Sequence, residues 1–364
     1  MKIAVLGAGA IGLGTTAALI ERGHAVRLWS PSGAGTAFLA EGQDLVAEGA
    51  ITGRFAPERA ASPREAIVGA DVALIAVPGN GHRTVIDAAC DHLVSGQTVI
   101  ISSHCSLSAL YLSRRLAEKR LACPIIAWAT TVTTGRRVPP NGVAVATLRK
   151  EVDLAAIPAR DSPAALATCR ALLGDRFRVR DDLLAIALSN LNPPSHMANA
   201  LCNLTRMEKG ERWANYDCIT ESVGRLIEAL DRERLAVAAA YGLKVRSVHE
   251  HMQLSFDLPQ GSMAEMARVL HARRGGPPGP ATLDHRYVTE DVPFGLVPLI
   301  AIARAAAVPV PLHEAGVALF TALYGRDFAA ENDLLPALGV GGMSARALHA
   351  VARDGFAASG GGTS

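Results

Sequence analysis

The first half of the chain alternates short apolar runs with longer segments of helical spacing. Residues 11–22 have the spacing of a helix, and Gly23 is expected to end it. Apolar runs of strand length occupy residues 2–6, 25–29, 71–77, 97–102, 124–127, 142–147 and 177–180. Strands that alternate with helices in this way predict an α/β domain built on one doubly wound, mostly parallel sheet.

From about residue 181 the pattern changes to helical spacing. Ile219, Val223 and Leu226 recur at helical intervals, and apolar residues continue to Ala240. Further helices are expected at residues 181–187, 261–273, 296–306 and 311–324. The sequence therefore predicts two domains, an α/β domain over residues 1–180 and an all-helical domain over residues 181–356, with the boundary between residues 179 and 182.

Two stretches rich in small residues are expected to lie outside regular elements. Residues 273–280 read RRGGPPGP, which predicts a mobile loop or a linker. Residues 357–364 are rich in Gly and Ser, which predicts a disordered tail.

The composition is typical of a globular protein and excludes several other classes. The chain has 364 residues, of which 49% are hydrophobic and 19% charged, enough for two cores. A net charge of +2 gives no electrostatic reason to bind nucleic acid or an anionic membrane, and the apolar runs end before membrane-spanning length. The six cysteines form no C-x-x-C pair, and no signal peptide precedes the first strand. We therefore expect a reduced, cytoplasmic protein.

The first strand runs directly into a glycine-rich turn that opens a helix. This hexapeptide is GAGAIG, and its candidate cofactor-binding residues are Gly7, Gly9, Ala10, Ile11 and Gly12. The first glycine makes the tight turn, the second lets the backbone approach a pyrophosphate, and the third lets helix and strand pack closely. The free N–H groups at the helix start would bind the phosphates. This context predicts a Rossmann domain that binds NAD(P).

The end of the second strand bears on the choice between the two nicotinamide cofactors. An Asp or Glu at this point would bind the ribose 2′-hydroxyl and favour NAD. The chain instead has Ser30 and Ser32, which could donate hydrogen bonds to a 2′-phosphate, although no Arg follows closely. These residues favour NADP(H) over NAD(H); as an alternative, the two serines only form a turn.

A second candidate for cofactor contact follows the apolar run at residues 71–77. Pro78, Gly79 and Asn80 come directly after it, and loops at the carboxyl ends of parallel strands lie on the edge where open α/β sheets bind ligands. These residues could contact the ribose or the nicotinamide end of the cofactor. A plain structural turn explains them equally well.

The candidate chemical residues lie in the second domain. His196 follows Asn192-Pro193-Pro194, where the chain has little conformational freedom, and His is the usual proton donor or acceptor near neutral pH. Residues 284–291 gather acidic and basic side chains beside an apolar stretch. Within them, Asp291 is the expected partner that orients His196, and Arg286 offers a planar fork for a substrate carboxylate. Asn192 is a further candidate for substrate binding.

Three motifs together resemble the opine dehydrogenases of the octopine/nopaline type, which are related to N-(1-carboxyethyl)-norvaline dehydrogenase. They are GAGAIG, N-x-N-P with His196 following, and D-x-R-Y-x-x-E-D-V-P-F-G-L-V-P from Asp284 to Pro298. The last motif is long and specific, and the resemblance covers about residues 1–325.

The resemblance implies a reaction and roles for the residues. The family condenses an α-amino acid or another amine with a 2-oxo acid through an imine and reduces it with NAD(P)H, reversibly. His196 and Asp291 would form the acid–base dyad, and Arg286 would hold a substrate carboxylate. A homodimer is expected by analogy. We identify no partner besides the amino acid and the 2-oxo acid.

The chain departs from the family pattern near the last strands of the first domain. The family often carries an acid there, and Trp128 stands in its place. This departure makes an unusual amine substrate conceivable. Arg136 and Arg137, which follow, could take over anion binding.

Other functions remain open from the sequence. A ketopantoate-reductase-like or 2-hydroxyacid reductase would place a catalytic Lys at the start of the second domain, but residues 181–200 contain none. A non-catalytic NADP(H)-binding sensor would explain the glycines, but not the combination of His196, Arg286 and Asp291. His249, Glu250 and His251 lack the H-E-x-x-H spacing of a metal site, so no metal is expected.

Overall fold

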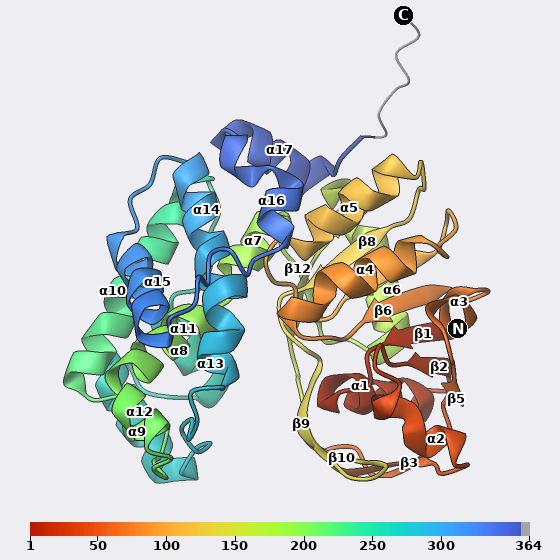
Figure 1. Cartoon of the computed structure of the whole chain (residues 1–364), viewed down its shortest axis with the longest axis horizontal. Coiled ribbons are helices and arrows are strands. Elements are labelled where there is room, and N and C mark those ends of the chain that lie inside the picture. Colours follow the sequence, from red (N-terminus) through yellow and green to blue (C-terminus); the bar gives the residue numbers. More distant parts are fainter. Residues whose placement is uncertain (358–364) are drawn as a thin grey trace, which may run out of the picture. The chain divides into compact units, whose positions relative to one another are not determined.

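The computed structural model describes residues 1–357 and divides them into two compact units (Figure 1). Unit 1 contains Met1–Ile186 and the described chain from Ala350 onward, and unit 2 contains Ala187–His349. The predicted tail, residues 357–364, lies outside the described residues except for Ala357.

Unit 1 is built on one large sheet whose strand order is β12-β11-β8-β7-β6-β1-β2-β5. The strands are β1 (Lys2–Leu6), β2 (Ala25–Trp29), β5 (Glu58–Arg59), β6 (Val72–Ile75), β7 (Thr98–Ile101), β8 (Ile125–Trp128), β11 (Val152–Ile157) and β12 (Phe177–Val179). Neighbouring strands are parallel except for the pair β11 and β8. The predicted doubly wound, mostly parallel sheet is confirmed. Its central strands are almost continuously buried, as expected when helices cover both faces.

A second, four-stranded sheet was not expected from the sequence. Its order is β4-β3-β10-β9, with β4 (Gly53–Phe55), β3 (Leu45–Gly49), β10 (Gly142–Leu148) and β9 (Thr133–Val138). The prediction that residues 142–147 complete the main sheet is wrong. They form a hairpin with β9 instead, because the two strands are close in sequence and Gly142 pairs directly with Val138.

The helices of unit 1 alternate along the chain with the strands of its two sheets. They are α1 (Ala10–Glu21), α2 (Ala37–Ala40), α3 (Pro63–Ile67), α4 (His82–Cys90), α5 (Ser108–Glu118) and α6 (Ser162–Leu173), with the 3-10 turns η1 (Ala34–Thr36), η2 (Gly79–Gly81) and η3 (Ala159–Asp161). The buried core joins the side chains of the sheet to those of α1 and α6, including Leu13, Leu28 and Leu172.

Unit 2 is helical, as predicted, and within its described residues the only β pairing is a single bridge between Ala214 and Pro278. Its helices are α8 (Asn192–Cys202), α9 (Leu204–Glu208), α10 (Glu221–Ala240), α11 (Val248–Phe256), α12 (Met263–Arg274), α13 (Arg286–Thr289), α14 (Val297–Ala305), α15 (Pro311–Tyr324) and α16 (Leu334–Leu338), with the π-helical turn η4 (Val292–Leu296) and the 3-10 turn η5 (Val340–Gly342). The division between the units falls within α7 (Leu183–Leu188) and α17 (Ala345–Asp354).

Two segments differ from the organisation that the sequence predicts. The chain from Ala350 belongs to unit 1 rather than to the helical domain, and the Phe356 N–H donates to Ser113 Oγ at 2.9 Å. Residues 273–280 are not a linker between domains, because they lie within unit 2. There the Pro280 carbonyl accepts a hydrogen bond of 2.8 Å from the Trp213 indole, and Gly279 packs against the same ring.

Candidate active site

His196 lies on α8, whose start is determined by the local sequence. Pro193 and Pro194 occupy the first turn, where a missing N–H costs no helical hydrogen bond. The Asn190 side chain accepts the Asn192 N–H at 3.1 Å and helps to satisfy the helix start. His196 follows in the next turn, and its side chain is 18% exposed. It is therefore accessible but held by the surrounding residues.

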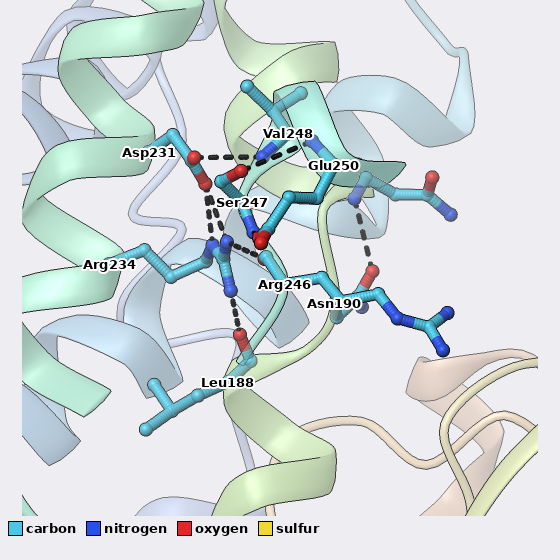
Figure 2. Close-up of polar contacts among 9 residues, drawn as sticks. Leu188, Asn190, Asp231, Arg234, Arg246, Ser247, Val248 and Glu250 are labelled. Carbon is cyan, nitrogen blue, oxygen red and sulfur yellow. Dashed lines mark hydrogen bonds and ion pairs between the residues drawn. The ribbon is translucent and has the colours of Figure 1, made fainter. Parts of the chain in front are cut away.

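The chain that enters α8 is anchored by a buried guanidinium (Figure 2). Arg234 on α10 is fully buried and donates to the carbonyls of Leu188 and Arg246, the latter at 2.6 Å. It also donates twice to Asp231 Oδ1, at 2.6 and 2.9 Å, and Asp231 Oδ2 accepts the Val248 N–H. This ion pair therefore fixes the segments that lead into α8 and α11 to one helix.

Asp291 immediately precedes the π-helical turn η4, a rare conformation that is frequent at functional sites. Its carboxylate is 9% exposed, and Oδ2 lies 2.6 Å from His196 Nδ1. The turn packs closely on α8, because a Cβ at Gly295 would lie 2.7 Å from Pro193 Cβ. Contact between Gly295 and Pro193 thus joins the two sequence motifs and brings Asp291 to His196.

The short Nδ1–Oδ2 contact determines which nitrogen of His196 carries a proton. Because a carboxylate only accepts hydrogen bonds, Nδ1 is the donor, and the lone pair of neutral His196 is on Nε2. Asp291 would also stabilise the imidazolium that forms when Nε2 takes up a proton. The pair can therefore move one proton to and from a substrate.

Tyr287 on α13 supports one face of the imidazole. The two rings are stacked, with centroids 3.5 Å apart and planes 11° from parallel. The Tyr287 hydroxyl accepts a hydrogen bond of 2.7 Å from Asn215, which in turn accepts one from Asn199. The side-chain oxygen of Asn199 accepts a further hydrogen bond of 3.0 Å from Asn203. Burial raises the pKa of Tyr287 to about 12, so the stacking ring is a neutral phenol.

The remaining residues of the acidic and basic cluster have partners. Arg286 is 60% exposed, and its Nε donates to Glu290 at 3.0 Å. His285 is half-buried, and its Nδ1 accepts the Tyr287 N–H at 3.3 Å. Burial lowers the pKa of His285, and the charges of His196 and Arg286 lower it further.

The motifs assign no role to His285 and Glu290, but both side chains are partly buried. The one usable signal was the i,i+4 spacing of Arg286 and Glu290, which favours an ion pair on a helix. Asp284 is exposed. Asn192, predicted to contact substrate, is exposed at the first position of α8 and lies one helical turn before His196.

The glycine-rich turn of unit 1 fits a dinucleotide. Gly7 has a φ of 128°, which favours glycine, and a Cβ at Gly12 would overlap the Gly7 carbonyl. Gly9, at the N-cap of α1, differs because a Cβ there would meet no described protein atom within 4 Å. Internal packing therefore gives no reason for a glycine at this position, whereas a ligand that approaches the backbone does. The turn leads into Ala10 and Ile11 at the start of α1.

The other predicted cofactor residues lie at the same edge of the sheet. Ser30 and Ser32 follow β2, with their hydroxyl oxygens 3.5 Å apart. Pro78, Gly79 and Asn80 follow β6, and Pro78 and Asn80 are exposed. Because β2, β1 and β6 are parallel neighbours, their carboxyl ends meet at one edge.

Trp128, which stands where the family often has an acid, belongs to the core of unit 1. It is fully buried, donates to Cys169 Sγ at 3.3 Å, and packs on Phe177 with centroids 5.2 Å apart. Its indole therefore does not present a polar group at the sheet edge.

Comparison with known proteins agrees with the geometry of both units. The model of the α-helical domain of NAD/NADP octopine/nopaline dehydrogenases matches residues 179–324, and that of ketopantoate reductase PanE/ApbA matches residues 3–145. The opine dehydrogenase of Arthrobacter sp. (strain 1C) is 32% identical over 350 residues, which cover 95% of this chain and 97% of the relative. The chain belongs to the opine dehydrogenase family. The resemblance inferred from the motifs is thus confirmed, and the protein is an NAD(P)-dependent oxidoreductase.

Solved structures of this family share the whole architecture. Octopine dehydrogenase with NADH and L-arginine superposes with a TM-score of 0.80 at 18% identity, covering 97% of this chain and 98% of that one. Yersinopine dehydrogenase with NADP+ gives 0.71 at 15% identity, covering 92% and 97%. In residues 1–357, no helix has both the length and the apolar character needed to cross a membrane.

Proposed function

We propose that this chain condenses the amine of an α-amino acid, or of a related amine, with a 2-oxo acid and reduces the resulting imine, with His196 as acid–base and Asp291 as its partner. The observation that carries the proposal is the 2.6 Å contact between His196 Nδ1 and Asp291 Oδ2 on two elements that the family motifs encode. The net reaction consumes the amine, the 2-oxo acid, NAD(P)H and a proton, and it releases an N-(carboxyalkyl) amino acid, NAD(P)+ and water.

His196 would manage the protons of the condensation. Nε2 accepts a proton from the attacking ammonium group, which frees the lone pair on nitrogen to form the C–N bond. The same proton can return to the hydroxyl of the addition product, which then leaves as water. Bound NAD(P)H supplies the hydride that reduces the imine carbon. General acid–base catalysis of this kind contributes roughly 10²–10⁴-fold to a rate.

Arg286 is the proposed anchor for a substrate carboxylate. The Nε of Arg286 donates to Glu290. In the described part of the chain, no residue is seen to accept a hydrogen bond from the two terminal nitrogens of Arg286. Those two nitrogens have the spacing that matches a carboxylate bidentately. Asn192, one turn before His196 on α8, is the proposed second substrate contact.

The cofactor and the setting are also part of the proposal. Ser30 and Ser32, with no acid at the end of β2, favour NADPH. No disulfide forms within residues 1–357, which supports a reducing compartment, and we propose the cytoplasm. Assembly as a homodimer stays a prediction.

The deciding experiment follows NADPH and NADH oxidation with pyruvate or another 2-oxo acid, with and without a panel of amino acids. Oxidation that needs the amine is expected. Oxidation that proceeds equally without it would instead indicate a hydroxyacid reductase, the activity that the match of residues 3–145 to ketopantoate reductase suggests.

The role of His196 is tested in the same assay. His196→Ala should lower turnover sharply and leave the affinity for NAD(P)H unchanged. His249→Ala is the matched control, because His249 also pairs with a carboxylate, Glu228 Oε1 at 3.2 Å, but lies on α11 away from the motifs. Unchanged turnover of His196→Ala would exclude the proposed role.

A further inference from the structure

One strand of the second sheet brings a cation to the dinucleotide turn. β9 packs along α1, where the hydroxyl oxygens of Thr133 and Thr15 are 3.3 Å apart. Further along β9, Arg137 Nη1 donates to the Ala8 carbonyl at 3.4 Å. The strand thus runs back along the helix to the turn that precedes it, and Arg137 flanks that turn.

The protein groups around Arg137 do not neutralise its positive charge. Its other hydrogen bond, from Nη2 to the Pro140 carbonyl, is also long at 3.4 Å. Among residues 1–357, no carboxylate lies within ion-pair distance of its guanidinium, although the side chain is partly buried. The start of α1 is the positive end of a helix dipole and has no acid in its first turn. A cation beside it is unfavourable unless an anion binds there.

The loop that follows β2 converges on the same place. Gly35 packs so closely that a Cβ there would lie 2.8 Å from Ala8 Cβ and 2.9 Å from Ser30 Oγ. Ala8 therefore contacts both this loop and Arg137. The chain has no Asp or Glu between Ser30 and Glu41, so no carboxylate of this loop repels an anion or binds a ribose 2′-hydroxyl.

We propose that Arg137 binds the 2′-phosphate of NADPH, with the hydroxyls of Ser30 and Ser32 as further donors, and thereby sets a preference for NADPH over NADH. A guanidinium matches phosphate oxygens bidentately, and a phosphate there would neutralise both Arg137 and the positive end of α1. The inference rests on the cofactor site of the proposed function, but it does not depend on which amine or 2-oxo acid reacts.

Direct binding tests the assignment without any catalytic turnover. Adenosine 2′,5′-bisphosphate and 5′-ADP are titrated by calorimetry into the full-length protein and its variants, followed by NADPH and NADH. The wild type should bind the 2′-phosphorylated member of each pair more tightly. Arg137→Gln should weaken binding of that member about 10- to 100-fold, the usual range for loss of a charged hydrogen bond, and leave 5′-ADP and NADH unchanged.

Arg136→Gln is the matched control. The sequence left Arg136 as a second candidate for anion binding, but Arg136 is exposed and lies on the opposite face of β9 from Arg137. Its loss should therefore change the affinity for neither nucleotide. Arg137→Lys keeps the charge without the fork and should give an intermediate loss; it also serves if Arg137→Gln fails to fold. An equal loss of affinity for both members of a pair would place Arg137 at the pyrophosphate and overturn the proposal. A wild type that binds both members equally tightly would overturn it as well. A failure to oxidise NAD(P)H with an amine would contradict the proposed reaction and leave these affinities interpretable.

Discussion

The imidazole of His196 lies against the phenol of Tyr287, with ring centroids 3.5 Å apart and planes 11° from parallel. Asp291 holds one edge of the same imidazole through Nδ1. The face and the edge are thus restrained by two residues of one short segment, which leaves the ring little freedom to turn. A proton acceptor that is fixed before substrate arrives loses less entropy in the reaction.

Replacement of Asp291 by Asn should be the most damaging change near His196. Asn keeps the shape but cannot stabilise the imidazolium, and its amide can hold the wrong tautomer. We expect kcat to fall by roughly 10²–10⁴-fold, with the affinity for NADPH unchanged. Asp284→Asn, at an exposed acid of the same motif, is the control and should keep full activity. A loss of less than about tenfold in Asp291→Asn would remove Asp291 from the dyad.

Two variants of Tyr287 separate stacking from hydrogen bonding. Tyr287→Phe keeps the ring and loses the 2.7 Å hydrogen bond from Asn215, so it should lower the free energy of unfolding by about 1 kcal/mol with little effect on kcat. Tyr287→Leu removes the stack, which is worth about 0.5–1.5 kcal/mol, so kcat should fall about 2- to 10-fold. Steady-state kinetics and denaturant unfolding measure both. Equal kcat for the two variants would show that stacking does not orient His196.

Several of these features could be read from local sequence, because their causes are local. Residues 311–324 were predicted as a helix and coincide with α15, since Pro311 marks the first turn and Gly325 adopts the left-handed cap. The apolar runs of the main sheet were equally clear. β9 was not predicted, because only one of its six residues is buried. β10 was predicted as a strand but assigned to the main sheet, because its pairing with β3 depends on chain that is distant in sequence.

Some residues of the chemical site could likewise be predicted from the sequence, and others could not. The pairing of His196 with Asp291 was expected from their chemistry and their motifs, although the two are 95 residues apart. The amides of Asn199 and Asn215 belong to no motif, and only the folded chain brings them to Tyr287. Arg234 is equally hidden in the sequence, where an arginine on an amphipathic helix predicts a solvated side chain.

The buried pair of Arg234 and Asp231 should be strongly coupled. Arg234→Met leaves the Asp231 carboxylate buried without its cation, which should lower the free energy of unfolding by about 3–5 kcal/mol. The double variant with Asp231→Leu should recover part of this loss, because no buried charge remains. Arg232→Met, at an exposed position of the same helix, should be neutral. Denaturant unfolding measures the wild type, the single variants Arg234→Met and Asp231→Leu, the double variant and the Arg232→Met control. Additive losses in the double variant would contradict the coupling.

Acid should destabilise unit 1 through two buried histidines. Burial lowers the pKa of His82 to about 4 and that of His104 to about 3, whereas an unfolded histidine titrates near about 6.5. The unfolded chain therefore binds more protons below that pH, and the stability present above it is lost as the pH falls. Protonation of each histidine should lower the free energy of unfolding by on the order of 3 kcal/mol by pH 4.

His104 offers the cleaner test of this pH dependence. Neither of its ring nitrogens has a hydrogen-bond partner in residues 1–357, so His104→Leu removes a buried polar ring without breaking a hydrogen bond. The variant should unfold at the same temperature as the wild type or higher at pH 7, and its melting temperature should fall less between pH 6.5 and 4.5. An unchanged dependence on pH would mean that His104 does not contribute to acid unfolding.

The glycines of the dinucleotide turn should separate ligand binding from folding. Gly9 has a φ of −76°, which alanine adopts freely, and a Cβ there meets no described atom within 4 Å. Gly9→Ala should therefore change the melting temperature by only a few degrees, yet weaken NADPH binding at least tenfold, because the methyl group occupies the space where the pyrophosphate approaches. Gly12→Ala is the counterpart, since its Cβ would overlap the Gly7 carbonyl and should lower the stability of unit 1 itself. Calorimetric titration with NADPH and thermal unfolding of the ligand-free proteins measure the two effects separately. Wild-type affinity in Gly9→Ala would mean that the cofactor does not approach this turn.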